Sequence, residues 1–154
     1  MIAAGAGAGS ARKYAAAVAT LRQTVLDTLN ARRAAEFWRE FLGWAYRPGD
    51  EPPPAGQPDP AGEDWLVLRN PDGGIGLAFQ QTAELARATW PRPDVPQQLH
   101  LDLTVPDIAA FDAEHERVLG LGATLLDDSR RADPEEPLRV YGDPDGHPFC
   151  IFVG

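Results

Sequence analysis

Four residues stand out because their side chains can transfer protons, attack electrophiles or bind metal ions. They are the three histidines, His100, His115 and His147, and the single cysteine, Cys150. A neutral imidazole is a common general base and metal ligand, and a thiolate is both a nucleophile and a zinc ligand. For His100 and Cys150, a purely structural interpretation stays open as an alternative to a chemical role. In that interpretation His100 is a hydrogen-bonding residue in a partly polar cleft, and Cys150 is a small buried apolar side chain.

The other two histidines also have structural interpretations. His147 stands between a turn glycine and a proline, where it would shape the start of a strand, and His115 falls on a predicted helix, where it would face solvent. The sequence has no glycine-rich phosphate loop, no serine nucleophile elbow and no paired-carboxylate motif. Chemistry in this chain therefore depends on few side chains.

His100 begins a stretch that alternates polar and apolar residues as far as Val105, which is the pattern of a half-buried strand. The leucines and Val105 share one face of that strand, and His100, Asp102 and Thr104 share the other. A turn and a helix over about 108–119 follow. The alternation predicts that His100 is displayed on a polar strand face, with Asp102 interpreted as a strand-end residue that satisfies backbone donors.

The first half of the chain has the same order of elements. Residues 23–27 align with 100–104, and the turn at 70–73 aligns with 143–146. Each half reads strand–helix–strand–strand–strand, so the sequence predicts a duplicated α+β chain of two βαβββ modules, each with its helix on the outer side of its sheet. The predicted boundaries are an extension over 1–20, a first module over 21–81, a linker over 82–97 and a second module over 98–154.

Three segments have no counterpart in the repeat. The Gly/Ala-rich extension contains Ser10, a suitable cap for a short helix over 11–19. The proline-rich stretch 47–64 is either a solvated loop or a lid over a cleft. The linker contains Trp90, a large side chain that needs burial and is expected to pin the linker to a sheet.

Composition excludes several classes of function. The 154 residues carry a net charge of −9 with no basic cluster, which argues against nucleic acid and anionic membranes as partners. The single cysteine excludes an internal disulfide and favours a reducing compartment. No apolar run approaches the length of a membrane span. We therefore expect a soluble cytoplasmic protein, and its 44% apolar content is enough for a core.

Three motifs together resemble the glyoxalase/bleomycin resistance/dioxygenase superfamily, also called the vicinal oxygen chelate superfamily, and its bacterial glyoxalase-like branch. They are QLHLDL (98–103), LGLGA (119–123) and DPDGHPFC (143–150), within a similarity over about 20–153. The resemblance implies that the two modules pair so that their curved sheets form a central cleft holding the active site. The motifs are more specific for the family than for any activity.

The resemblance also implies four cleft positions. These are Gln23 and His100 on the first strands, and Leu77 and Cys150 on the last strands, four residues after each turn glycine. Metal-using members hold a divalent cation there with His or Gln and with Glu, but both carboxylates are missing from this chain. Gln80 lies near Leu77, but strand alternation points it to the other side. We therefore predict no cofactor and no glyoxalase-type Ni, Mg or Fe site, because these cations need more oxygen ligands and negative charge.

Zinc is the metal that these residues suit best. It prefers thiolate and imidazole ligands, and by the resemblance His100 and Cys150 face the same point. Gln23 would be the third ligand, and an amide is a poor one. A zinc site of His100, Cys150 and Gln23 thus stays open beside the metal-free interpretation.

The resemblance and the missing carboxylates together predict a protein that binds a small, planar or apolar organic molecule in the cleft between the modules. The alternative is an enzyme of the same superfamily, a lyase, isomerase or dioxygenase-like protein, that uses His100 as a general base on a small metabolite. Small members of the superfamily commonly dimerise, and open sheets have edges that need covering. We therefore predict a homodimer.

Overall fold

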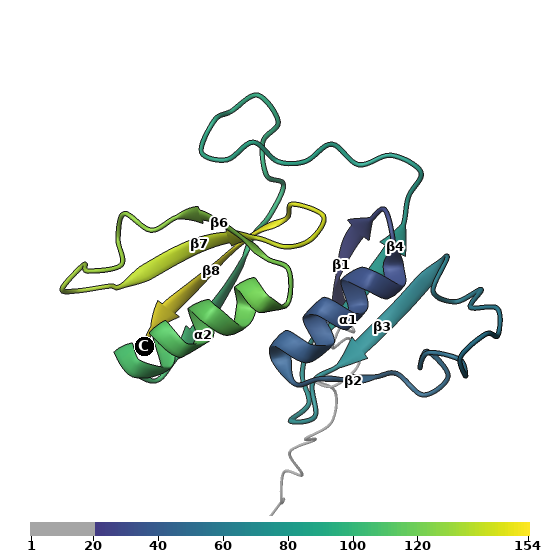
Figure 1. The fold of residues 1–154 in the computed structure, drawn as a ribbon. Helices are drawn as coiled ribbons and strands as arrows, with labels where there is room; N and C mark the ends of the chain where they lie inside the picture. Colours follow the sequence, from purple (N-terminus) through teal and green to yellow (C-terminus); the bar gives the residue numbers. More distant parts are fainter. Residues whose placement is uncertain (1–20) are drawn as a thin grey trace, which may run out of the picture.

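The computed structural model describes residues 21–154, so the predicted extension and its helix over 11–19 lie outside the described residues. Two consecutive βαβββ units follow one another along the chain (Figure 1). The first contains β1 (Gln23–Thr28), α1 (Ala31–Leu42), β2 (Ala45–Tyr46), β3 (Trp65–Arg69) and β4 (Gly76–Gln81). The second contains β5 (Leu101–Val105), α2 (Ile108–Gly120), β6 (Thr124–Asp127), β7 (Leu138–Gly142) and β8 (Pro148–Val153).

Each unit forms one four-stranded mixed sheet with the same topology. The strand orders are β1-β4-β3-β2 and β5-β8-β7-β6, in which the first strand of each unit pairs in parallel with the last. The remaining pairs are antiparallel. The sheets are curved and do not close, and the predicted α+β fold of two βαβββ modules is confirmed.

Local sequence signals fix the start and end of α1. The Asn30 side chain caps its N-terminus by accepting a hydrogen bond from the Arg33 amide at 2.8 Å. Gly43 ends it in the left-handed conformation, with φ of +66°, which glycine adopts at little cost. Asp107 caps α2 in the same way through the Ala110 amide. The strand–helix connections are therefore short and well defined.

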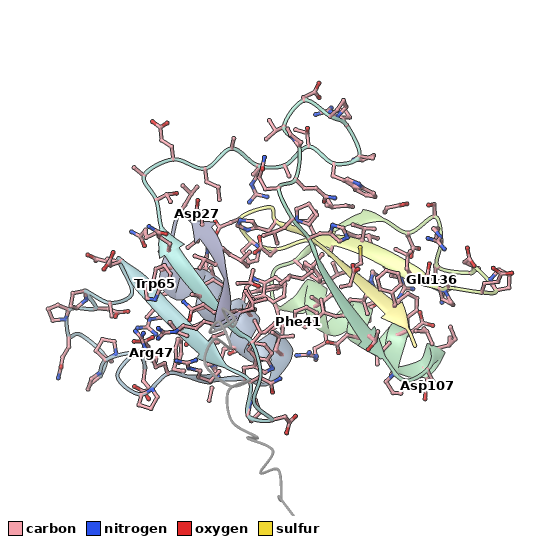
Figure 2. All side chains as sticks on the ribbon, turned by 180° about the vertical axis from the view of Figure 1, so that it is seen from behind. Asp27, Phe41, Arg47, Trp65, Asp107 and Glu136 are labelled. Atoms are coloured by element: carbon pink, nitrogen blue, oxygen red, sulfur yellow. The ribbon has the colours of Figure 1, made fainter. Side chains whose placement is uncertain are left out.

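Each helix packs on one face of its own sheet, as predicted, α1 on β3 and β4 and α2 on β5 and β8, and the two helices in addition share one core. Phe37, Trp38 and Phe41 of α1 place their rings 5.3–6.1 Å from the ring of Phe149 on β8, in the other unit. Figure 2 shows Phe41 in the centre of the molecule, between the two halves. The reason is the aromatic face of α1, which is too large for its own sheet to bury and is completed by the second sheet.

Buried polar contacts join the units beside this core. Asp143 and Asp145, in the turn between β7 and β8, are 2–3% exposed. The Trp38 indole donates a hydrogen bond to Asp143 at 3.1 Å, and Asp145 accepts hydrogen bonds from Thr28 and Arg33. Each of these donors belongs to the first unit, so the two halves are held together as one body.

The segments between elements occupy different places. The loop over 47–64 is anchored by Asp50, which accepts a hydrogen bond from the Val67 amide, and by an ion pair between Arg32 and Asp59 at 2.8 Å. The linker over 82–97 crosses from one sheet to the other, at the top of Figure 1. Within residues 21–154, no helix is both long and apolar enough to cross a bilayer.

Candidate functional site

The chemistry-bearing residues of the second unit lie on the sheet face that points away from the shared core. Leu101, Leu103, Phe149 and Ile151 pack into that core, so strand alternation places His100, Asp102 and Cys150 on the opposite face. Asp102 and Cys150 are direct partners in the parallel β5–β8 ladder. His100 Nε2 lies 3.5 Å from Asp102 Oδ1, and the ligand atoms of His100, Asp102 and Cys150 all lie within 4.8 Å of one another.

The structure does not place Leu77 on the corresponding face of the first sheet. Leu77 is 4% exposed and belongs to the core cluster, whereas the neighbouring Ala78 points to the other side. The register gives the reason. Val25 pairs with Ala78 as Asp102 pairs with Cys150, because an additional glycine, Gly74, follows Gly73 in the first turn. The counterpart of Cys150 is therefore Ala78, and the prediction of Leu77 as a cleft residue is wrong by one position.

The two glutamines of the first sheet have different surroundings. Gln80 points away from Leu77, as predicted, and this orientation puts it on the face of Ala78, where it lines a hollow. Gln23 pairs with Gly76, and its buried Oε1 has no hydrogen-bond partner. Gln23 is not among the residues that line the hollows described below. His100 and Cys150 are thus brought together with Asp102, while Gln23 stays in the other sheet.

The larger hollow, which we call the junction hollow, lies where the two units and the linker meet. It has a volume of about 370 Å³. Asp27, labelled in Figure 2, and Gln80 come from the first sheet, and His147 comes from the turn before β8. Linker and strand residues complete the lining: Val25, Leu26, Leu85, Ala86, Arg87, Ala88, Pro96, Gln97, Gln98, Leu99, Asp145, Gly146 and Pro148.

The smaller hollow, the sheet hollow, covers the outward face of the second sheet and has a volume of about 210 Å³. His100 and Cys150 form part of its floor, and Trp90 of the linker forms part of its wall, which fits the expected anchoring of the linker. The other lining residues are Gln97, Asp127, Arg130, Leu138, Val140 and Pro148. The two hollows adjoin, since Gln97 and Pro148 line both.

Cys150 is not activated as a nucleophile. Burial, together with the negative charge of Asp102, raises the pKa of the Cys150 thiol to about 11. The side chain is thus a neutral thiol near neutral pH when no cation is bound. A cation held beside it would reverse this preference, because a coordinating thiol is deprotonated.

The half-buried His147 and the buried Asp143 form a pair at the edge of the junction hollow. Histidine Nδ1 lies 3.2 Å from both carboxylate oxygens of Asp143. Burial favours a higher pKa for Asp143, but the hydrogen bond and charge of His147 outweigh it and hold that pKa below its ordinary value. Burial favours a lower pKa for His147, but the hydrogen bond to Asp143 and its charge raise that pKa above the ordinary value.

His115 differs from its sequence interpretation, because it is half-buried rather than solvated and its Nδ1 lies 3.0 Å from the Tyr141 hydroxyl. Asp102 is the functional candidate that the sequence reasoning overlooked. The signal was present, since Asp102 shares the polar face of its strand with His100. Gln97 gave no such signal, because its contacts depend on where the linker folds back, and Trp90 was expected to pack on a sheet but not to line a hollow.

Comparison with known proteins identifies a related family. A family model described as the Glyoxalase-like domain matches residues 23–152 of the chain. No curated protein sequence matches it significantly.

Solved structures share the fold at low sequence identity. A glyoxalase/bleomycin resistance protein/dioxygenase family enzyme from Burkholderia phytofirmans PsJN is 15% identical with a TM-score of 0.64, over 88% of this chain and 98% of that one. The fosfomycin resistance protein FosX from Mesorhizobium loti is 18% identical, with a TM-score of 0.60 over 89% and 93%. TnmS3, an antibiotic binding protein from Streptomyces sp. CB03234, is 20% identical, with a TM-score of 0.53 over 88% and 96%.

Proposed function

Because the chain belongs to the glyoxalase-like domain family, as its motifs predicted, we propose that it binds a small organic molecule in the junction hollow. The observation that carries the proposal is the hollow itself. Its volume of about 370 Å³ falls in the range of small-molecule sites, and its walls come from both modules and from the linker between them. A hollow at such a junction is a common place for ligands.

The lining of the junction hollow indicates what kind of molecule fits. Val25, Leu85 and Leu99 offer apolar surface, which favours an apolar or planar body. Arg87 provides positive charge at one side, His147 provides an imidazole, and Asp27 provides a carboxylate. The ligand we propose therefore has an apolar body and polar ends that include an anionic or hydrogen-bond-accepting group.

The similar structures support this class of ligand. One is named as a fosfomycin resistance protein and another as an antibiotic binding protein. Their likeness to this chain extends to the fold, while the lining of the junction hollow is particular to this sequence. We propose an antibiotic or a comparable small metabolite as the ligand.

A glyoxalase-type metal does not fit the residues present. The last-strand positions that would supply carboxylates are Ala78, which has no ligand atom, and Cys150, which is a thiol. Gln23 and His100 alone bring no negative charge, and a hard divalent cation needs several oxygen ligands. No step of the proposed function involves such a metal.

Catalysis by the same fold is the second candidate function, with His100 as its general base. The arrangement that favours it is the position of His100 in the sheet hollow, 3.5 Å from a carboxylate that can orient an imidazole. In that case a substrate bound in the sheet hollow would be consumed, and His100→Gln would stop its turnover.

We further propose that the protein is a homodimer. The outward sheet faces and the edge strands carry exposed apolar side chains, including Val25, Leu125 and Leu126, which are 36–38% exposed. Unpaired edge strands and exposed apolar surface both favour association. The other partner we propose is the small-molecule ligand.

The test of ligand binding is a thermal-shift screen of chelator-treated protein against antibiotics and small metabolites, with fosfomycin included, followed by calorimetry on each hit. A ligand at one hundred times its Kd should stabilise the fold by about 2.7 kcal/mol. Ala88→Phe, which fills the junction hollow from the linker, should abolish the shift. Ala83→Phe, on an exposed linker position outside the hollow, is the matched control and should preserve it. A hit that binds both variants equally would refute the location.

A further inference from the structure

We infer that His100, Asp102 and Cys150 form a zinc site on the outward face of the second sheet. The three residues supply an imidazole, a carboxylate and a thiol from one side of two paired strands. Their ligand atoms lie within 4.8 Å of one another, and the side chains of His100 and Asp102 are 43% and 57% exposed. Zinc ions in solution can therefore reach them.

The geometry suits four-coordinate zinc with little rearrangement. At zinc–ligand distances of 2.0–2.3 Å, the ligand atoms of a tetrahedral site are roughly 3.3–3.8 Å apart. His100 Nε2 and Asp102 Oδ1 are already 3.5 Å apart. The three ligand atoms lie within 4.8 Å of one another, so a shift of roughly 1 Å brings all of them to the tetrahedral spacing. Rotation of the exposed His100 and Asp102 side chains about their χ angles toward the Cys150 Sγ can supply this shift without movement of the strands.

The charges also balance. Asp102 and a Cys150 thiolate together carry two negative charges, which neutralise Zn²⁺. A glyoxalase-type cation was excluded because the last strands lack carboxylates. For zinc this lack is compensated, since Asp102 supplies a carboxylate from β5, the first strand of the second unit. Burial among Leu138, Val140 and Pro148 on the thiol side makes this neutralisation more important, because charges are poorly solvated there.

A fourth coordination position faces the sheet hollow. Three protein ligands and one exchangeable position are typical of catalytic zinc, whereas structural zinc has four protein ligands. Gln97 lies beside the ring, with its Nε2 3.4 Å from His100 Nδ1, and with the imidazole Nε2 on the metal the protonated Nδ1 would donate to the Gln97 Oε1 once that amide is turned over. The fourth ligand would be water or a donor atom of a molecule in the sheet hollow.

This inference is independent of ligand binding in the junction hollow, and it excludes the second candidate function, because an imidazole that binds zinc through Nε2 is not a free general base. The zinc site lies within one module and borders the sheet hollow through His100 and Cys150, whereas the proposed ligand site lies in the junction hollow. Failure of one would leave the other intact. It also differs from the zinc set predicted from sequence, because Asp102 takes the place of Gln23.

The decisive experiment is titration of purified, metal-free protein with Co²⁺ and then Zn²⁺. Cobalt bound by a thiolate gives a near-ultraviolet charge-transfer band, and Cys150 is the only cysteine in the chain, so the band can arise from no other residue. We expect one equivalent of Co²⁺ to produce the band and one equivalent of Zn²⁺ to remove it. Absence of binding, or binding without the band, would overturn the inference.

Variants identify the remaining ligands. Asp102→Asn and His100→Ala should each weaken zinc binding by more than the roughly 10–100-fold that loss of an outer hydrogen-bond partner costs. Cys150→Ser should remove the cobalt band. His115→Gln, which changes a histidine on α2 away from the cluster, is the control and should bind zinc as tightly as the wild type. Wild-type affinity in Asp102→Asn, or loss of binding in His115→Gln, would show that the ligand set is wrong.

Discussion

Replacement of Phe149 by alanine tests whether the two modules share one core. The Phe149 side chain is fully buried on β8, and its ring stacks on Tyr141 of its own sheet at 5.3 Å. On its other side it meets Phe37, Trp38 and Phe41 of the first module. If the structure is right, Phe149→Ala creates a cavity at the boundary between modules instead of within one.

The expected loss of stability is large. Buried phenylalanine-to-alanine changes cost about 3–5 kcal/mol, as lost burial plus the residual cavity. Phe149 should fall in the upper part of that range, because four aromatic rings surround it and cannot collapse easily into the space. For a protein of this size, each kcal/mol lowers Tm by about 2–4 °C, so the total decrease should be roughly 6–20 °C.

The assay is urea unfolding followed by circular dichroism, with Phe152→Ala as the matched control. Phe152 is on the same strand, is half-buried and points to the outward face, so its removal should cost much less. A double-mutant cycle of Phe149→Ala with Trp38→Ala should give a coupling energy of about 0.5–3 kcal/mol, since the two rings are in contact. Equal losses for Phe149→Ala and Phe152→Ala, or no coupling to Trp38, would refute the shared core.

Three further predictions concern protonation, metal content and assembly. The raised pKa of His147 means that its pairing with Asp143 stabilises the fold below the ordinary imidazole pKa of 6.5 and loses this contribution as pH rises through the folded pKa. Hence the free energy of unfolding of wild type minus that of His147→Gln should be larger at about pH 6 than at about pH 9, and a difference that grows with pH would contradict the pairing. Purified protein should contain far less than one equivalent of Mg or Mn, and adding these hard cations should leave Tm unchanged, whereas a stoichiometric amount of either would disprove our assignment of Ala78 and Cys150. Light scattering at micromolar concentrations should give the mass of a homodimer, and a monomer mass throughout would exclude one.

The repeat made most of the fold predictable. Alternation from His100 to Val105 and the matching turns at 70–73 and 143–146 are local signals, and each led to an element that the structure contains. What these signals did not predict is that α1, besides packing on its own sheet, also contacts the second sheet. Whether an aromatic face such as that of α1 packs on its own sheet alone or also on another depends on contacts between residues distant in the sequence.

The candidate site was predictable only in part, for two physical reasons. Leu77 was assigned by counting from a turn glycine, and one additional residue in a turn moves every following side chain to the other sheet face. Gln97 lies in a linker without periodicity, so nothing in the sequence indicates that it reaches His100. Cys150 was found because it lies on a regular strand after a well-marked turn, and His100 because it directly precedes a strand with clear alternation.

The loss of carboxylates from the last strands does not remove negative charge from the second sheet. Asp102 stands opposite Cys150 in the β5–β8 ladder, so a carboxylate lies across from the position where a glutamate would be expected, on the neighbouring strand. This exchange changes the chemistry, because a thiol and a carboxylate beside an imidazole favour a softer metal with few ligands, whereas two carboxylates favour a hard cation with many. In the first sheet the equivalent pair is Val25 and Ala78, which offers no ligand atom at all. The outward faces of the two sheets therefore differ in chemistry, with Val25 and Ala78 on the first and Asp102 and Cys150 on the second.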